Sequence, residues 1–451
     1  MKHARSRVRT ARGFTLVELM VSLVAGLIVT IAVIGLARAA TATFFEAARI
    51  SSVEATVRTA AERLRQDLVR VSYMSTGNIR LARDGAPGVP MAHKIAVADP
   101  TAALTGSRYV ALNDLQGIRI IVGGSGNAPI PGAGTAGPNV LSASNLLNPD
   151  AAILAGNFTT DDSYQGTYLP AGGTCAGGQM IQLNTAADAA VRRLLTSNGN
   201  PQANIEAAFT PVIAPPTLFS ARVVDARGCQ HYVVVCGVVA NAAGAQISIA
   251  QDAGGGPGLL PGTSTNCGVR DLEPVTINPV QRVRWYVGPN VDATLDPTPG
   301  VEAAGNKFNL YRDFLDAANP PAPIVPMRQI VAEFMADLKF GITVADAANA
   351  LQVFEMDTDP GGGAGAIDTY TQTASTTVAG QPGPQRVRSV RFRVATRAAV
   401  PDRTAPILPS GAPYLTRYCI EALPAATCTK FARVRTVVSE AALTNQLGMT
   451  Y

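Results

Sequence analysis

A long apolar run near the N-terminus is the strongest pattern in the sequence. From Leu19 to Ala37 no charged residue occurs, which makes 19 consecutive uncharged positions. A helix crosses the hydrocarbon of a membrane with about 20 such residues, whereas a cleaved secretory signal has an apolar core of about 7 to 15 residues. The run therefore predicts a membrane-spanning helix rather than an ordinary secretory signal.

A second pattern begins after Arg38, where apolar positions recur every three or four residues. This period is typical of an amphipathic helix that packs one face against a protein core. No proline interrupts residues 14–72, so we expect one continuous helix of about 88 Å at 1.5 Å per residue. Gly77 can adopt a left-handed conformation, which favours a helix end at residues 75–78. The expected apolar face comprises Val53, Val57, Ala60, Leu64, Leu68 and Val71.

Two pairs of opposite charges lie in this amphipathic part of the sequence. Glu54 and Arg58 are four residues apart, and so are Arg63 and Asp67. Side chains at this spacing are neighbours on a helix surface and stabilise it modestly. We expect both pairs to lie on the solvated face of the helix.

From residue 75 onward the pattern is that of short strands separated by loops rich in Gly, Pro and Ala. No repeat with a period of 20 to 50 residues is present. Apolar and polar residues alternate best at 387–397, and we expect Arg391 and Arg393 of this half-buried strand to face solvent. The sequence thus predicts an α+β fold, with a long N-terminal helix on an antiparallel β-rich head of one or two lobes. Expected strands lie at 117–124, 221–239, 282–288, 309–315 and 386–397.

The distribution of charge changes how the net charge of +5 is interpreted. Of the 37 basic residues, five (Lys2, Arg5, Arg7, Arg9 and Arg12) precede the apolar run, which leaves 32 basic against 32 acidic residues. A neutral remainder gives no reason to expect a nucleic-acid partner. Basic residues before a membrane span predict that the N-terminus stays in the cytoplasm and that the head lies outside.

Six cysteines follow the apolar run, an even number that suits an oxidising compartment. Cys419 and Cys428 close a short loop, and we expect them to form a disulfide. The other four leave two arrangements open, because Cys229 and Cys236 can pair with each other, or with Cys175 and Cys267.

The sequence offers little material for a catalytic site. Only three histidines occur, and His3 lies in the basic leader, so we expect neither a histidine triad nor a multi-histidine metal site. His231, between Cys229 and Cys236, could be proposed as a zinc ligand, but we favour disulfides for these cysteines. The acidic segments 159–162 and 357–362 lack the pattern of a calcium loop and are interpreted as polar turns. We therefore expect no cofactor, no metal and no enzymatic activity.

Glu18 is the unexpected residue of the N-terminal region. An ionised carboxylate at the edge of a hydrophobic span is costly unless it is paired or reaches the interface, and Arg12 is one candidate partner. The stretch RGFTLVELM, joined to a basic leader and an apolar helix, closely resembles the signal of type IV prepilins and pseudopilins.

The resemblance implies specific chemistry and a type IV pilin-like fold. It implies cleavage by prepilin peptidase between Gly13 and Phe14, methylation of the new N-terminus at Phe14, and pairing of Glu18 with the N-terminal amine of a neighbouring subunit. The domains it implies are a prepilin leader at 1–13, a transmembrane and filament-core helix at 14–37, the amphipathic second half of that helix at 38–74, and a β-rich head at 75–451.

Downstream segments resemble, in the same order, the body of PilW-type minor pilins. The resemblance implies a minor pilin that primes assembly of a type IV pilus or caps its tip. Its partners would be other minor pilins, the major pilin, a large tip adhesin and the inner-membrane assembly platform, and its roles motility or adhesion. The matching segments are 150–164, 282–288 with 309–313, 327–342, 387–397 and 431–440.

On this interpretation the protein is held in the bacterial inner membrane, with its head in the periplasm, until it enters the pilus at the cell surface. A minor pseudopilin of type II secretion or of a DNA-uptake system is the alternative within the same superfamily. A membrane-tethered extracytoplasmic enzyme is an alternative from another class, disfavoured because no catalytic constellation is present in the sequence.

Overall fold

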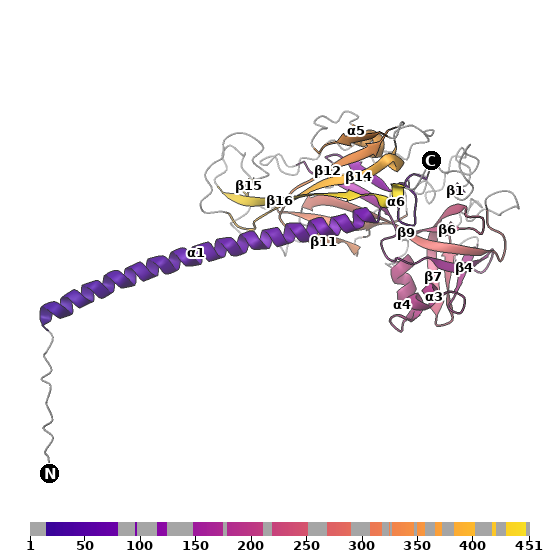
Figure 1. The fold of residues 1–451 in the computed structure, drawn as a ribbon. Coiled ribbons are helices and arrows are strands. Elements are labelled where there is room, and N and C mark those ends of the chain that lie inside the picture. The colour runs from indigo at the N-terminus through magenta and orange to yellow at the C-terminus, as the bar shows by residue number, and fades with distance from the viewer. Residues whose placement is uncertain are drawn as a thin grey trace, which may run out of the picture. The chain divides into compact units, whose positions relative to one another are not determined.

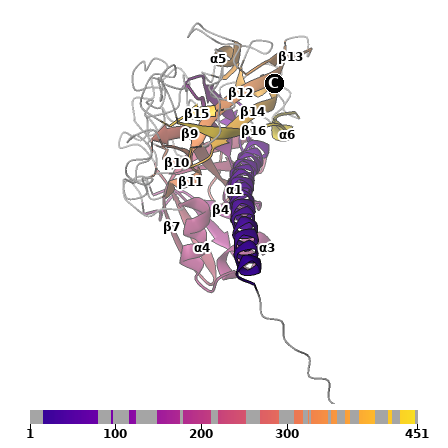
Figure 2. The same ribbon diagram turned by 90° about the vertical axis from the view of Figure 1, so that its left-hand side faces the viewer.

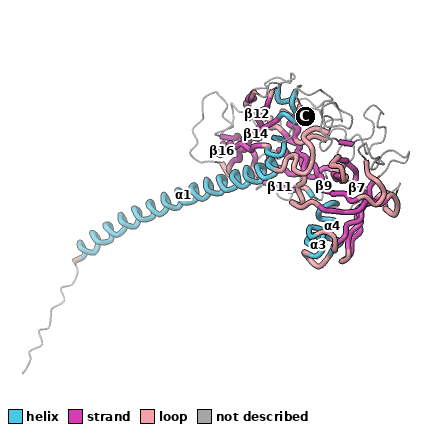
Figure 3. The backbone as a smooth tube through the Cα atoms, turned by 45° about the vertical axis from the view of Figure 1, so that its right-hand side comes forward, coloured by secondary structure: helices cyan, strands magenta, loops and turns pink. Residues whose placement is uncertain are grey.

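The structure is a computed structural model. It forms two compact units, Met1–Glu54 and Ala55–Tyr451, which are described separately below. Figure 3 shows one long helix, several short helices and a head made largely of strands. The residues described are 15–79, 95–96, 115–123, 148–174, 178–210, 219–250, 268–289, 307–317, 324, 327–346, 350–356, 366–371, 383–401, 417–420 and 430–447.

The helix α1 (Leu16–Val69) supplies all the described structure of the first unit. Among the described residues it is the one helix that is long and apolar enough to cross a membrane. The apolar side chains from Leu16 to Leu36 are exposed, as expected for a segment whose environment is lipid or other helices. The long N-terminal helix and the β-rich head together confirm the predicted α+β fold.

The second unit contains an antiparallel sheet with the order β2-β3-β9-β10-β11. Figure 1 shows its strands beside the C-terminal part of α1, which belongs to the same unit. The last part of α1 buries its apolar face against this sheet, so helix and sheet share one hydrophobic core. The strands are β2 (Ile118–Ile121), β3 (Ala151–Gly156), β9 (Pro274–Pro289), β10 (Phe308–Leu315) and β11 (Gln329–Ala332).

A second antiparallel sheet completes this core, with the order β13-β12-β14-β16-β15. Buried side chains of β12 and β14, among them Leu338, Phe340 and Phe392, belong to the same hydrophobic cluster as Leu64 and Leu68 of α1. The strands are β12 (Met335–Ala345), β13 (Leu351–Phe354), β14 (Val387–Arg397), β15 (Arg417–Cys419) and β16 (Phe431–Ala442). The short helices α5 (Ala366–Thr371), η4 (Pro384–Arg386) and α6 (Thr444–Leu447) accompany them.

Six strands close on themselves to form a small antiparallel barrel. The pairing runs β4-β5-β8-β7-β6-β9 and returns from β9 to β4. Closure removes sheet edges, and a barrel this small is filled by its own side chains. Its apolar core is separate from the core shared with α1. The strands other than β9 are β4 (Tyr164–Leu169), β5 (Met180–Asn184), β6 (Phe219–Val224), β7 (Gln230–Asn241) and β8 (Gly244–Ile249), and β1 (Ile95–Ala96) pairs parallel to β7.

Two short helices, α3 (Ala189–Thr196) and α4 (Pro201–Phe209), pack on the barrel (Figure 2). Asp188 caps α3 by accepting a hydrogen bond from the backbone N–H of Ala190 at 2.8 Å, and Asn200 caps α4 with proline next in sequence. Their buried residues, among them Leu195 and Phe209, extend the apolar core of the barrel.

The strand β9 belongs to both sheet systems. Its first half, from Pro274 to Val280, pairs with β4 and β6 in the barrel. Its second half, from Gln281 to Pro289, pairs with β3 and β10 beside α1. One continuous strand therefore joins the barrel to the sheet that carries the helix.

Two details differ from the sequence predictions. Residues 221–239 form two strands, because the Asp225 carboxylate accepts backbone N–H groups of Arg227 and Cys229 and turns the chain. The helix ends at Val69, and the left-handed residues beyond it are Ser72 and Met74 rather than Gly77. The expectation of a glycine end was therefore wrong.

Candidate assembly site at the ends of the long helix

The first turn of α1 is closed by a reciprocal pair of hydrogen bonds between Thr15 and Glu18. The backbone N–H of Glu18 donates to Thr15 Oγ1 at 3.2 Å. The backbone N–H and the hydroxyl of Thr15 donate to Glu18 Oε2 at 3.2 and 3.1 Å. This arrangement is a capping box, which satisfies orphan donors at a helix start. The carboxylate is thus engaged within its own helix, and it remains exposed.

The predicted cleavage and methylation residues, Gly13 and Phe14, lie outside the described residues. Phe14 directly precedes Thr15 in the sequence, so cleavage at Gly13 would leave both members of the capping box on the mature chain. A new ammonium group at Phe14 would lie one residue before the cap. Glu18 is the acidic residue in the first turn of α1, where a carboxylate also complements the helix dipole.

At the other end of α1, the predicted apolar face is buried in the head. Val57, Ala60, Leu64 and Leu68 are each no more than 1% exposed, and Val53 is half-buried. At about 25 cal/mol per Å² of apolar surface, each large side chain of this kind contributes about 1.5 to 3 kcal/mol. The stripe predicted from the sequence is therefore the docking surface of the helix.

A buried charge sits within this apolar face. Asp67 Oδ2 accepts a hydrogen bond from Trp285 Nε1 at 2.9 Å and one from Arg312 Nε at 2.7 Å. Arg312 Nη2 donates to Asp67 Oδ1 at 3.3 Å, which makes the contact bidentate. Trp285 lies on β9 and Arg312 on the neighbouring strand β10, where they are paired in register. Asp67 therefore fixes α1 to the centre of the first sheet.

The prediction that Arg63 and Asp67 form a solvated pair was wrong. Asp67 faces the core, and Arg63 Nη2 instead donates to Gln329 Oε1 at 3.1 Å. Sequence reasoning also missed Trp285 and Arg312. Two signals pointed toward them: Asp67 follows Leu64 by three residues, which puts it near the apolar stripe, and the chain contains a single tryptophan.

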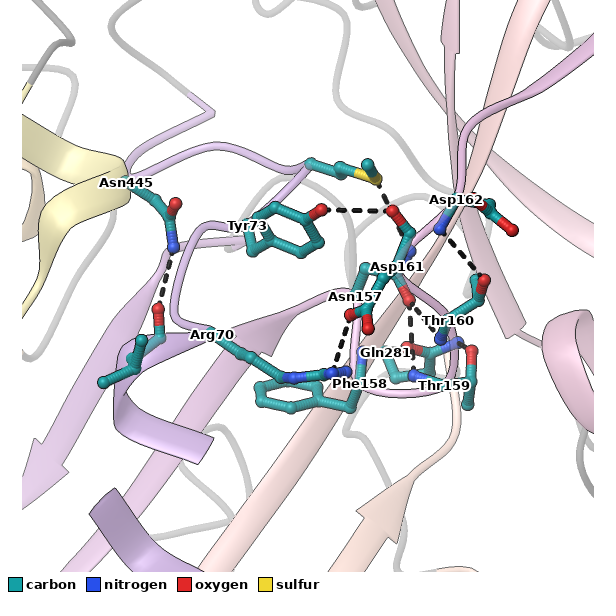
Figure 4. A network of polar contacts seen from close by, with 12 residues as sticks. Arg70, Tyr73, Asn157, Phe158, Thr159, Thr160, Asp161, Asp162, Gln281 and Asn445 are labelled. Carbon is teal, nitrogen blue, oxygen red and sulfur yellow. Dashed lines mark hydrogen bonds and ion pairs between the residues drawn. The ribbon is translucent and has the colours of Figure 1, made fainter. Parts of the chain in front are cut away.

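Beyond Val69 the chain is held by Asn445 of helix α6 and by Asp161, in the turn between β3 and β4 (Figure 4). Asn445 Nδ2 donates to the carbonyl oxygens of Val69 and Val71 at 2.8 and 3.1 Å, and so caps carbonyls that the helix end leaves free. Arg70 Nη2 contacts Asp161 Oδ1 at 2.6 Å, and Tyr73 donates its hydroxyl to the backbone oxygen of Asp161 at 3.1 Å.

The acidic segment 159–162 has carboxylates that pair with arginines. Asp161 pairs with Arg70, and Asp162 pairs with Arg193 of α3 at 2.8 Å. Asn157 Oδ1 accepts the backbone N–H groups of Thr159 and Thr160, which shapes a turn. The segment is a polar turn tied to the end of α1, as interpreted from the sequence. The other acidic segment, 357–362, lies outside the described residues.

Two more buried carboxylates connect elements of the head. Asp150 accepts hydrogen bonds from Gly123 N, Lys339 Nζ and Phe340 N at 2.9 to 3.0 Å, and burial raises its pKa despite the neighbouring lysine. Asp337 pairs with Arg393 at 2.7 Å, and burial raises the pKa of Asp337 to about 6. The Arg393 side chain is only 11% exposed, so the expectation that it faces solvent was wrong.

His231, which was considered and disfavoured as a zinc ligand, contacts a buried carboxylate. Its Nε2 lies 3.1 Å from Asp225 Oδ2, and both side chains are buried. Burial works to raise the pKa of Asp225, but hydrogen bonds from His231 and from backbone N–H groups outweigh it and lower that pKa. The histidine thus contributes to the turn between β6 and β7.

The described cysteines bear on the disulfide predictions. None of Cys229, Cys236 and Cys419 is a free thiol. Cys229 directly precedes β7 and Cys236 lies within it, so about 23 Å of strand at ~3.3 Å per residue separates them. Disulfides need Cα atoms within about 7 Å, so of the two arrangements left open by the sequence, pairing with Cys175 and Cys267 fits this strand better. Cys175, Cys267 and Cys428 lie outside the described residues.

The comparisons with known proteins agree with the N-terminal pattern. Residues 8–34 match the family model described as the prokaryotic N-terminal methylation motif. No curated protein and no solved structure matches the chain. The chain therefore carries a prepilin-type signal leading into an apolar helix, which implies processing by prepilin peptidase, anchoring in the inner membrane before assembly and a pilin-like or pseudopilin-like role.

Proposed function

We propose that this protein is a noncatalytic minor pilin, PilW-like in its body, that primes or caps a type IV pilus. The observation that carries the proposal is the N-terminal methylation motif at residues 8–34, which runs directly into α1 with Glu18 in its first turn. An exposed apolar helix suits both a bilayer and a bundle of similar helices in a filament core. The same helix can therefore anchor the protein in the membrane before assembly and pack in the filament core afterwards.

Glu18 supplies the register of assembly in this proposal. A carboxylate and an ammonium group that meet in apolar packing favour one axial position, because either charge alone is penalised there. The capping box holds the Glu18 carboxylate at the start of the helix, where Thr15 and the N-terminal amine of a neighbouring subunit would compete for it. The charge, rather than the cap, is the feature that assembly uses.

The construction of the head supports a place at an end of the filament. Its second unit extends from residue 55 to 451 and contains a closed barrel in addition to the two sheets that hold α1. A head of this size is hard to repeat at the close spacing of internal subunits. At an end it would contact other minor pilins and a large tip adhesin, with motility or adhesion as the outcome.

The first experiment is intact-mass and N-terminal peptide analysis of the protein from cells with and without prepilin peptidase. A mature chain that begins at methylated Phe14, and that is absent without the peptidase, supports pilin processing. Detection of that chain at the end of sheared, purified pili supports the minor-pilin role. Recovery only with a secretion or DNA-uptake machine would favour a pseudopilin, and an uncleaved Met1 start in both strains would overturn the proposal.

A further inference from the structure

The side chain of Met74 lies in an unusually polar environment just beyond α1. Asn278 Nδ2 donates to Met74 Sδ at 3.3 Å, Asn157 Nδ2 donates to it at 3.7 Å, and Ser163 Oγ lies 3.8 Å away. A thioether sulfur is only a weak hydrogen-bond acceptor. Three donors directed at one methionine sulfur are therefore poorly matched to it.

The mismatch is largest for Asn157, because Asn278 Nδ2 also donates to Ser163 Oγ at 2.9 Å. Asn157 is 0% and Asn278 1% exposed. The oxygen of Asn157 accepts two backbone N–H groups, and the acceptor found for its amide nitrogen is the Met74 sulfur. A buried donor without a good acceptor costs about 1 to 3 kcal/mol. A stronger acceptor in the place of the Met74 sulfur would therefore satisfy these hydrogen-bond donors better.

The backbone at Met74 is also unusual. Its φ is +50°, in the left-handed region that residues other than glycine rarely adopt, and Ser72 two residues earlier has φ +60°. Such conformations persist only where the surrounding structure imposes them, and they cluster at functional sites. Here they direct a half-buried methionine toward the barrel, at the point where the end of α1 meets β9.

We propose that Met74 is an oxidation site whose sulfoxide is held by Asn157, Asn278 and Ser163. The oxidant is a peroxide such as hydrogen peroxide. A lone pair on the Met74 sulfur attacks one peroxide oxygen, the O–O bond breaks, and the departing hydroxide takes up the remaining proton and leaves as water. The sulfur is oxidised by two electrons and the peroxide is reduced. The new S=O oxygen is a strong acceptor, and it replaces the weak one among the three donors.

This inference stands independently of the proposed pilus role, because it rests on the contacts of one side chain. The expected consequence of oxidation is a more stable junction between the end of α1 and the barrel. Oxidation ordinarily disrupts cores by making methionine polar, whereas at Met74 it strengthens the contacts between the end of α1, the 157–163 turn and β9. The junction of helix and barrel would therefore become more stable under oxidising conditions.

The test uses the mature full-length protein in detergent micelles, treated with hydrogen peroxide and mapped by mass spectrometry. The sulfoxide is expected to form at Met74 on the order of ten times faster than at Met335, which is 0% exposed. At a dose that oxidises Met74, the midpoint of thermal unfolding is expected to rise by about 2 °C. Slower oxidation of Met74 than of Met335, or a midpoint that falls or does not move, overturns the proposal.

Two variants separate the effect of Met74 from that of other methionines. Met74→Leu keeps the apolar volume and removes the sulfur, so peroxide should not raise its midpoint. Asn278→Ala removes the closest donor, so the rise should be smaller than in the unchanged protein. A rise of equal size in Met74→Leu would assign the effect to another methionine and would also overturn the proposal.

Discussion

Replacing Asp67 by alanine tests how α1 is held on the head. The change removes a carboxylate that accepts hydrogen bonds from Trp285 and twice from Arg312. The Arg312 side chain is 7% exposed, so its charge would stay buried without this partner. Breaking a buried ion pair by removing one member costs about 3 to 5 kcal/mol, and the indole N–H is left unsatisfied as well. We expect a loss of about 4 kcal/mol in the free energy of unfolding.

The matched control is Glu62→Ala, which removes an acidic side chain from the same helix. Glu62 lies 3.9 Å from Arg65, and both side chains are at least half exposed. An exposed pair of this kind contributes about 0 to 1 kcal/mol, so the control should behave almost as the unchanged protein does. Asp67→Asn, which keeps one carbonyl oxygen, should fall between the two.

The assay is urea unfolding of the mature chain in detergent, followed by tryptophan fluorescence. Trp285 is the single tryptophan of the chain and is fully buried against the helix, so its emission reports directly on this junction. A loss in Asp67→Ala no larger than that in Glu62→Ala would refute the reasoning. Such a result would mean that the apolar face alone holds α1 on the head. The buried pair of Asp67 and Arg312 would then contribute nothing to the free energy of unfolding.

The remaining predictions concern assembly, pH and disulfides. Glu18→Gln keeps the capping box but removes the charge, so pilus counts should fall as far as in Glu18→Ala. Thr15→Ala should cost about 1 kcal/mol of helix stability yet keep pilus counts near normal, and normal piliation in Glu18→Gln would contradict the register argument. Because burial raises the pKa of Asp337 from 3.8 to about 6, its stabilising contribution is full below pH 4. Denaturant midpoints across pH should show that about 3 kcal/mol of it is lost as the pH rises through 6, and Asp337→Asn should lack this loss. Non-reducing peptide mapping should join Cys175 to Cys236 and Cys229 to Cys267.

The disulfide prediction follows from described neighbours in the sequence. Thr174, which precedes Cys175, bonds to Ser248 Oγ at 3.1 Å, and Cys236 Sγ lies 3.3 Å from the Ser248 carbonyl oxygen. Gly268, which follows Cys267, donates its N–H to the Asp225 carboxylate that also binds the N–H of Cys229. These contacts of neighbouring residues are the reason to expect Cys175 to pair with Cys236 and Cys229 with Cys267. Any other linkage found by mapping would contradict this expectation.

Local patterns were sufficient to predict the elements that depend on local rules. The 19-residue uncharged run and the spacing of Val57, Leu64 and Leu68 follow from the period of one helix, and both are present in the structure. The alternation at 387–397 likewise predicted β14. These features need only the positions of neighbouring residues in the chain, so the sequence contains the information directly.

Features that depend on distant partners could not be predicted in the same way. The capping box is local and was missed for a different reason, because Glu18 was considered only as a charge that needs a partner outside its own turn. Asp67 was assigned to the surface because Arg63 lies four residues before it, whereas its partner Arg312 is 245 residues away. A buried arginine near 11% exposure, such as Arg393, has the same periodic position as a solvated one. Burial and partner identity are properties of the assembled sheets rather than of any single window.

The closed barrel is the clearest case of a non-local property of the fold. Its closure requires the first half of β9, from Pro274 to Val280, to pair with both β4 and β6, which a pattern over 282–288 cannot reveal. Slipping such a strand by one residue would turn every side chain to the opposite face. The same strand continues to Trp285, whose indole N–H donates to Asp67 of α1.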